Sequence, residues 1–290
     1  MDVFLEILKA ILFGIVEGIT EWLPVSSTGH IILLKALCPP DVSAEFYDFF
    51  EIVVQLAAIA AVIVLFFKKL NPFALSKSVQ EKKATWQLWF KVVIAVVPSA
   101  VIGLKFDSEL DDFLRGTKLL GTDLNTLVVA ATLAIYGVAF ILVEKRNARR
   151  IFGIQKVEDI TYKTAVLIGA FQCLSLIPGT SRSGATILGA ILLGVGRAAG
   201  AEFSFFLAIP TMLGAGMLKT VMFLWENGFS ATTNEMVFLI VSCVVAFVVS
   251  LLVIKGLMEF VRKRSFAAFG IYRIALGALV LGFFLIRALI

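Results

Sequence analysis

The chain has 290 residues, of which 60% are hydrophobic and only 16% are charged. A soluble domain is roughly 45–50% apolar and about 25% charged, so the mean hydropathy of +0.97 excludes an ordinary soluble protein and predicts a single polytopic membrane domain. The formal net charge of +5 does not indicate a nucleic-acid partner, because the basic residues lie in short segments between apolar runs, where they signal membrane topology.

The N-terminal residues and the cysteines add two expectations. Asp2 and Glu6 stand where a signal peptide would be basic, so no cleavable signal is expected. Cys38, Cys173 and Cys243 lie in or beside apolar segments without the spacing of metal ligands. They are expected to be small apolar side chains, not disulfide or metal sites.

Apolar runs along the chain predict its helices. Four runs are too short to span a membrane and form two pairs, about 3–16 with 27–37 and about 164–177 with 184–195. A proline and a polar loop interrupt each pair, which predicts two re-entrant helix–loop–helix hairpins. Six other runs approach the roughly 20 residues of a spanning helix: about 50–67, 88–104, 124–143, 203–225, 235–254 and 269–290.

The charges between these runs predict the topology. Basic residues dominate 68–87, 144–163 and 255–268, and we expect these segments to be cytoplasmic. Segments 38–49 and 105–123 are acidic on balance and should lie outside. Six spans satisfy these assignments only if neither hairpin crosses the membrane, so the first hairpin enters from outside and the second from the cytoplasm.

Opposite entry predicts an inverted repeat of residues 1–143 and 144–290. Each half has a proline three residues before a serine, and later a glutamate followed by Leu-Ala. These residues are Pro24, Ser27 and Glu51 in the first half and Pro178, Ser181 and Glu202 in the second. The predicted fold is therefore an all-α polytopic membrane protein with an inverted-topology repeat, six spanning helices and two re-entrant hairpins that meet near the midplane.

Residues 17–30, EGITEWLPVSSTGH, place ionisable and hydroxyl groups between two apolar runs. Glu17 and Glu21 are four residues apart and share one face of a helix. Carboxylates inside a bilayer need a partner, water or a metal ion. The alternative is an amphipathic helix end whose glutamates lie in headgroup water.

The second half of this segment, PVSSTGH, combines a helix break with a histidine. Pro24 ends the first half-helix, and Ser26 or Ser27 is expected to cap the next one. Capping explains the serines but not His30, the only histidine in the chain. If the hairpin folds back, His30 comes within reach of the two glutamates, so we predict a functional role.

Residues 178–186, PGTSRSGAT, open the second helix of the other hairpin. A Gly- and Ser-rich loop at a helix N-terminus suits an anion, and Arg182 would add bidentate contacts to phosphate oxygens. The alternative is a kink whose arginine reaches the membrane surface. Acids and a histidine from one hairpin and phosphate-binding groups from the other indicate phosphoryl chemistry on a lipid-embedded substrate. The expected phosphate-binding residues are Ser26, Thr28, Gly179, Thr180, Ser181, Ser183 and Thr186.

Both motifs resemble the signatures of the bacterial undecaprenyl pyrophosphate phosphatase family, which is linked to bacitracin resistance. Segments 50–62, 161–179, 202–210 and 266–277 are also similar to family sequence, so the resemblance covers most of the chain. The family tends to have an acidic residue before the second hairpin, where this chain has Glu158 and Asp159 side by side.

The resemblance implies an integral hydrolase of the bacterial cytoplasmic membrane. Such an enzyme removes the terminal phosphate of undecaprenyl diphosphate and so recycles the lipid carrier of cell-wall glycans. It implies a site open to the outer side, a divalent cation, Mg²⁺ or Ca²⁺, and a homodimer among membrane lipids. The matching functional positions are Glu17, Glu21, Ser27, His30 and Arg182, supported by Ser26, Thr28, Ser181, Ser183 and Thr186.

The residues leave the mechanism and two other functions open. Ser27 is the first candidate nucleophile, activated by His30 or a glutamate, while His30 could instead act as acid, base or nucleophile. Glu17 and Glu21 could orient His30 or bind the metal ion. A polyprenyl-phosphate transporter or flippase would need the anion site but not these acid–base groups. A protein that only sequesters lipid diphosphate would release no phosphate.

Overall fold

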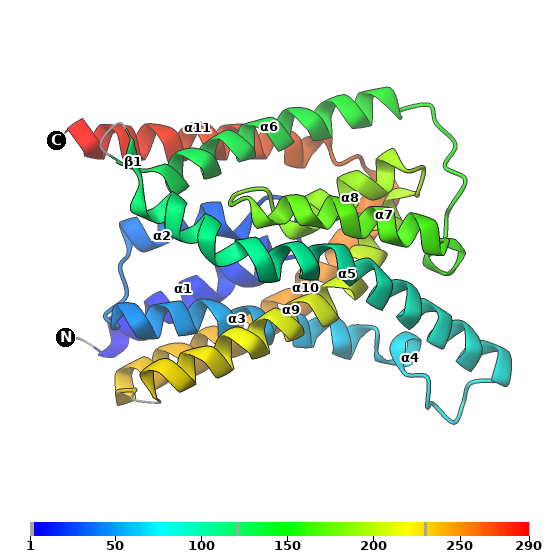
Figure 1. Cartoon of the computed structure of the whole chain (residues 1–290), viewed down its shortest axis with the longest axis horizontal. Helices are drawn as coiled ribbons and strands as arrows, with labels where there is room; N and C mark the ends of the chain where they lie inside the picture. Colours follow the sequence, from blue (N-terminus) through cyan, green and yellow to red (C-terminus); the bar gives the residue numbers. More distant parts are fainter. Residues whose placement is uncertain (1–2, 120–121, 229–230, 290) are drawn as a thin grey trace.

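A computed structural model describes residues 3–119, 122–228 and 231–289, and these form a bundle of helices (Figure 1). Among the described residues, β structure is limited to a two-residue antiparallel pair, β1 (Lys118–Leu119) and β2 (Thr122–Asp123), and an isolated parallel bridge between Ile154 and Val195. The helices are α1 (Val3–Thr20), α2 (Ser27–Leu37), α3 (Ala44–Leu65), α4 (Phe67–Leu70), α5 (Val79–Gly116), α6 (Leu124–Arg146), η1 (Val157–Asp159), α7 (Tyr162–Gln172), η2 (Cys173–Leu176), α8 (Arg182–Leu192), α9 (Arg197–Asn227), α10 (Thr233–Lys263) and α11 (Ala267–Leu289).

The predicted spanning helices are confirmed. Among the described residues, six helices are long and apolar enough to cross a membrane, namely α3, α5, α6, α9, α10 and α11. They begin earlier or end later than the apolar runs, because polar residues at their ends continue the helical hydrogen bonding. Pro98 in α5 and Pro210 in α9 lie inside continuous helices.

The two interrupted pairs form four shorter helices, as the breaks predict. α1 reaches 18 residues, but Glu6, Lys9 and Glu17 make it too charged for an ordinary span. α8 begins at Arg182, two residues before the predicted boundary. The connection after α1 is unusual for a loop because it lies largely inside the protein, with Trp22 fully buried.

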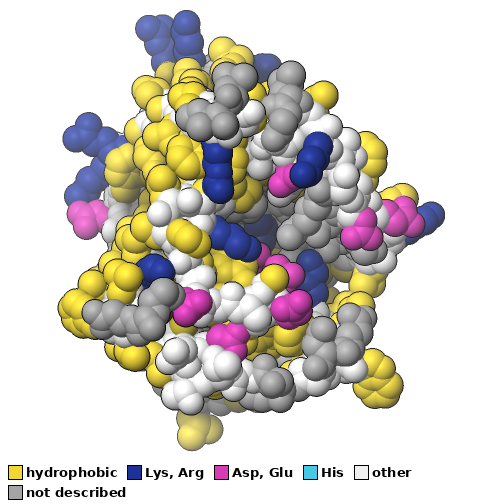
Figure 2. Space-filling model, turned by 90° about the vertical axis from the view of Figure 1, so that its left-hand side faces the viewer, with side chains coloured by type: hydrophobic (Ala, Val, Ile, Leu, Met, Phe, Trp, Pro, Cys, Tyr) yellow, Lys and Arg dark blue, Asp and Glu magenta, His cyan; other side chains and the backbone are white. Residues whose placement is uncertain are grey.

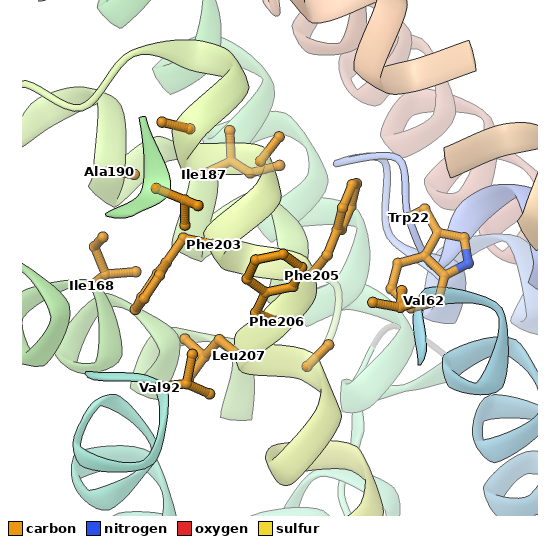
Figure 3. Close-up of a cluster of buried hydrophobic side chains, with 14 of the residues drawn as sticks. Trp22, Val62, Val92, Ile168, Ile187, Ala190, Phe203, Phe205, Phe206 and Leu207 are labelled. Carbon is orange, nitrogen blue, oxygen red and sulfur yellow. The ribbon is translucent and has the colours of Figure 1, made fainter. Parts of the chain in front are cut away.

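A core of aromatic and aliphatic side chains holds this inner loop in place (Figure 3). Trp22 meets Phe205 of α9 edge to face, with ring centroids 5.5 Å apart and planes at 85°. Phe66, which follows α3, packs on Phe206 of α9 in the same way. Ile187 of α8 belongs to the same cluster, so both interrupted pairs rest on α9.

Glycines let α1 lie very close to α10. A Cβ atom at Gly14 would come within 2.6 Å of the Ser242 carbonyl oxygen, and one at Gly18 within 2.8 Å of the Ala246 carbonyl oxygen. The Ser250 hydroxyl then donates to the Gly18 carbonyl at 3.4 Å. Small residues and hydroxyl groups commonly join helices in membranes, where water supplies no hydrophobic driving force.

Ion pairs join the segments that are predicted to be cytoplasmic, and these segments lie at one end of the bundle. The Lys69 ammonium lies 2.6 Å from Glu158 and 2.8 Å from Glu202. Arg197 binds Glu144, which also accepts the Phe266 backbone N–H at 3.2 Å. The β1–β2 pair and both chain ends lie at the opposite end of the bundle (Figure 1).

The contact between Lys69 and Glu158 favours the charged form of both groups. Burial alone would lower the pKa of Lys69, but hydrogen bonds to Glu158 and Glu202 raise its pKa overall. For Glu158, burial acts to raise the pKa, but the hydrogen bond from Lys69, a backbone hydrogen bond and the positive charges of Lys69 and Lys156 together lower it. Of the two adjacent acids, Glu158 is therefore the one that joins segments 68–87 and 144–163.

The close approach of α1 and α10 gives a matched pair of glycine variants. We expect Gly18→Ala to destabilise the protein by about 1–3 kcal/mol, because its methyl group would overlap α10. Gly256→Ala is the control, since a Cβ atom there meets nothing within 4 Å and alanine favours the helix. Thermal unfolding in detergent measures both, and equal midpoints would contradict the close packing.

Candidate active site

The two inner loops end in the same backbone conformation. Ser26 (φ 73°) and Ser181 (φ 70°) are the non-glycine residues with positive φ in the described part of the chain. Each caps the following helix: Ser26 Oγ accepts the Gly29 N–H at 3.4 Å, and Ser181 Oγ accepts the Gly184 N–H at 3.1 Å. Such strained residues cost of order 1–3 kcal/mol and cluster at functional sites.

When the two loops are aligned on these caps, their residues pair one position differently from the pairing that the sequence suggests. The sequence pairing, counted from the prolines, places Ser27 opposite Ser181. The caps instead align SSTG, residues 26–29, with SRSG, residues 181–184. Ser27 and Arg182 therefore occupy equivalent first positions of α2 and α8, so one loop presents a hydroxyl where the other presents a guanidinium.

Glu21 joins these two first-turn residues. Ser27 Oγ donates to Glu21 Oε2 at 3.2 Å, and Arg182 Nη2 donates to Glu21 Oε1 at 3.1 Å. The Glu21 and Arg182 side chains are only 10% and 11% exposed, so the pair is shielded but open to one side. Arg182 also donates to the Ser204 carbonyl at 3.0 Å, while its Nε lies buried without a partner.

Other hydroxyl groups expected to bind phosphate instead hold the loops together. Ser183 Oγ reaches the carbonyl oxygens of Glu21 at 3.3 Å and Leu23 at 3.2 Å. Thr186 is fully buried, and its Oγ1 lies 2.6 Å from Ser204 Oγ. In this arrangement neither hydroxyl faces an open space, whereas Thr28, in the first turn of α2, is exposed.

Arg273 of α11 connects the two loops from behind and is 0% exposed. Nη1 donates to the Pro24 carbonyl at 3.1 Å. Nη2 donates to the carbonyls of Gly179 at 2.9 Å and Thr180 at 3.0 Å. One guanidinium thus satisfies three carbonyl groups that the helix breaks leave unpaired.

His30 lies beside the cluster, but its partners differ from those expected. Nδ1 lies 2.7 Å from the Ser26 carbonyl oxygen, and Nε2 lies 2.7 Å from the Tyr272 hydroxyl. Both ring nitrogens are therefore bonded outside the Glu21–Ser27 pair. In this arrangement Glu21, not His30, is the basic group that contacts Ser27.

Glu17 and Glu21 differ in whether their carboxylate oxygens are free to bind the expected divalent cation. Both Glu21 oxygens have partners, whereas Glu17 is 2% exposed and its Oε1 is buried without one. In the described part of the chain, no three His, Cys, Asp or Glu side chains form a ready metal site. Glu17 fits a cation that takes one or two carboxylates and completes its coordination with water and phosphate oxygens.

A cleft of about 830 Å³ opens between α3, α5, α9 and η2, and its lining includes Glu51, Gln172 and Lys219. None of Ser27, His30 and Arg182 lines it. Figure 2 shows charged side chains of both signs around a hollow in the face where α1 begins and α9 ends. Glu51 of this lining interacts electrostatically with Glu17, which also interacts with Glu21, so the cleft adjoins the cluster on the side of Glu17.

Comparison with known proteins identifies the family of the chain. A family described as "Bacitracin resistance protein BacA" matches residues 10–279. The chain belongs to this family. An "Undecaprenyl-diphosphatase" of Enterococcus faecalis is 50% identical over 97% of this chain and 99% of its own length. Proteins of the same name from Acetivibrio thermocellus (50% identity, 97% and 98% coverage) and, as "Undecaprenyl-diphosphatase 1", from Clostridioides difficile (51% identity, 97% of both chains) match as well.

Within this BacA family member, the structure brings Glu21, Ser27 and Arg182 together, as the two motifs predict, with Glu17 and His30 at the edges of the cluster. Sequence reasoning missed Tyr272 and Arg273. Arg273 did carry a signal, because a charged residue inside an apolar span is a functional candidate. Its three carbonyl partners follow from the packing of α11 and not from local sequence.

The hydrogen bonds from Arg273 to the two loops lead to a prediction about stability. Arg273→Met should destabilise the protein by more than about 3 kcal/mol, because three buried carbonyls lose a donor and each costs about 1–3 kcal/mol. Arg273→Lys should recover only part of this, since an ammonium cannot reproduce the planar fork. Thermal unfolding tests it, with Arg287→Met on the exposed end of α11 as control. Wild-type stability of Arg273→Met would contradict the bridge.

Proposed function

We propose that the chain is a membrane phosphatase that hydrolyses undecaprenyl diphosphate to undecaprenyl phosphate and inorganic phosphate. The observation that carries the proposal is the Ser27–Glu21–Arg182 cluster, in which one carboxylate contacts both a serine hydroxyl and a buried guanidinium. The relatives named undecaprenyl-diphosphatase at about half identity supply the substrate. In the cell this reaction recycles the carrier of cell-wall glycans and accounts for bacitracin resistance.

The cluster suits an in-line displacement at phosphorus. Glu21 takes the proton of Ser27, and Ser27 Oγ forms a bond to the terminal phosphorus while the bond to the bridging oxygen breaks. The lipid phosphate leaves with the bonding electrons, and water then hydrolyses the phosphoserine. Direct attack by water, with Glu21 as base and no phosphoserine, is the second mechanism that this geometry allows.

Arg182 and the first turns of α2 and α8 bind the diphosphate. Both helices begin at the cluster, so their free N–H groups and positive dipole ends attract phosphate oxygens. The buried Nε of Arg182 is a donor without a partner. Preorganised donors of this kind stabilise the charge that develops in the transition state.

A divalent cation, Mg²⁺ or Ca²⁺, would be held by Glu17 together with phosphate oxygens of the substrate. Bound there, it would neutralise the diphosphate charge and polarise the phosphoryl group. The unpartnered Glu17 Oε1 supports this assignment, and Glu21 remains committed to Ser27 and Arg182. We therefore assign Glu17 to the cation and Glu21 to proton transfer.

The same proposal includes an inverted repeat with two re-entrant hairpins. Three observations support it: six helices of spanning length, two interrupted pairs, and the shared cap geometry of Ser26 and Ser181. The basic segments at one end of the bundle face the cytoplasm by the positive-inside rule. The site then opens to the outer side of the cytoplasmic membrane, and a homodimer is compatible with the exposed apolar helix faces.

Activity is tested by phosphate release from undecaprenyl diphosphate by the purified protein in detergent. We expect turnover that EDTA abolishes and added Mg²⁺ or Ca²⁺ restores. Arg182→Ala should lower kcat by roughly 10²–10³-fold, because an oxyanion-stabilising donor is lost. If the wild-type protein binds the lipid but releases no phosphate with any metal ion, transport or sequestration replaces hydrolysis as the function.

Ser27→Ala separates the two mechanisms. A covalent nucleophile predicts a loss of roughly 10³-fold or more, and acid quenching should trap a phosphoserine in the wild-type enzyme. Ser76→Ala, in an exposed loop at the basic end, should leave turnover unchanged. Activity of Ser27→Ala within a few-fold of wild type would reject Ser27 as nucleophile and favour direct attack by water.

Topology is tested with reporters fused after residue 290 and inserted after Ser76. We expect the C-terminal fusion to be extracytoplasmic and the Ser76 insertion to be cytoplasmic, because the C-terminal end of α11 and the connection between α4 and α5 lie at opposite ends of the bundle (Figure 1). Reporter enzymes that are active on only one side of the membrane give the readout. A cytoplasmic C-terminus would overturn the proposed orientation.

A further inference from the structure

The partner of His30 lies 242 residues away in the sequence, on α11. The Tyr272 hydroxyl oxygen lies 2.7 Å from His30 Nε2, and the two ring planes are within 9° of parallel. The ring is fixed on its other side by the contact of 2.7 Å between Nδ1 and the Ser26 carbonyl oxygen. His30 is therefore held between the strained cap of α2 and the side chain of α11.

These two contacts decide the tautomer of the neutral imidazole. A carbonyl oxygen can only accept, so Nδ1 must carry the proton that is donated to Ser26. Nε2 is then the unprotonated nitrogen, and the Tyr272 hydroxyl donates to it. The hydrogen bond on one ring nitrogen thus determines the chemistry available at the other.

Neighbouring residues of α11 face different surroundings. Arg273 is fully buried and bonds both inner loops, whereas Tyr272 is 47% exposed. A tyrosine that served only to fill the interior would be buried, and its hydroxyl would bond a backbone group. This hydroxyl instead bonds the only histidine of the chain at the open edge of the cluster.

We propose that Tyr272 is a positioning residue that holds His30 with Nε2 unprotonated and oriented for proton transfer. The inference rests on the proposed phosphatase activity. Tyr272 acts through His30, whose unprotonated Nε2 can only accept a proton, so in this arrangement His30 serves as the base for the hydrolytic water, since Glu21 already contacts Ser27. The same α11 turn therefore fixes the loops through Arg273 and the acid–base group through Tyr272.

The first test is spectroscopic and uses the fact that the chain has one histidine. Protein labelled with ¹⁵N-histidine, with its purification tag removed, gives one Nδ1 and one Nε2 signal. At a pH where the ring is neutral, we expect a protonated Nδ1 and an Nε2 that accepts a hydrogen bond. In Tyr272→Phe the Nε2 signal should move toward that of an unbonded imine nitrogen.

The second test is kinetic. Tyr272→Phe should lower kcat about tenfold, a fraction of what acid–base catalysis contributes, with KM within about twofold of wild type and an unchanged thermal midpoint. Tyr162→Phe, in the first turn of α7, is the matched control and should change neither kcat nor the histidine signals.

Unchanged His30 signals in Tyr272→Phe would overturn the contact, and an unchanged kcat would overturn its role in the reaction. If the wild-type protein releases no phosphate, the proposed function fails instead. The histidine signals still decide whether Tyr272 holds His30, so the two failures are distinguishable.

Discussion

The buried loop between α1 and α2, and the one before α8, place carbonyl groups in an interior that water does not reach. Inside a membrane domain each such group must find a donor within the protein. Arg273 supplies three of these hydrogen bonds from a single guanidinium, to Pro24, Gly179 and Thr180. The two loops can therefore end side by side, and every contact of the cluster around Glu21 depends on this.

The same caps that begin α2 and α8 also create the site. Ser26 and Ser181 adopt a strained conformation, and the next residue of each helix contacts Glu21: Ser27 within its own loop and Arg182 from the opposite loop. Two copies of one local structure thus present complementary groups. In the proposed mechanism, these equivalent positions supply the nucleophile and the cation that bind and cleave the diphosphate.

Hydropathy and charge predicted the helices well because both are local properties. Six apolar runs became six long helices, and a proline beside polar residues marked each break. A serine cap was also predictable from its position before a helix, although the sequence left it open between Ser26 and Ser27, and the structure assigns it to Ser26. The contact of His30 with Tyr272, and those of Arg273 with the two loops, could not be predicted. They join α11 to residues that are 93 to 249 positions away in the sequence, and they depend on how α2, α6 and α11 pack. For that reason the sequence left His30 and the glutamates as equal candidates for the base.

The pairing of Glu21 with Arg182 links substrate binding to catalysis in the proposed mechanism. A buried guanidinium without a partner would be strongly destabilising, so in the free protein Glu21 neutralises it. When phosphate oxygens take over Arg182, the Glu21 oxygen that Arg182 held becomes free. Ser27 is already bonded to the other oxygen of Glu21. In the proposed mechanism the diphosphate itself therefore releases Glu21 from Arg182 and leaves it to accept the proton of Ser27.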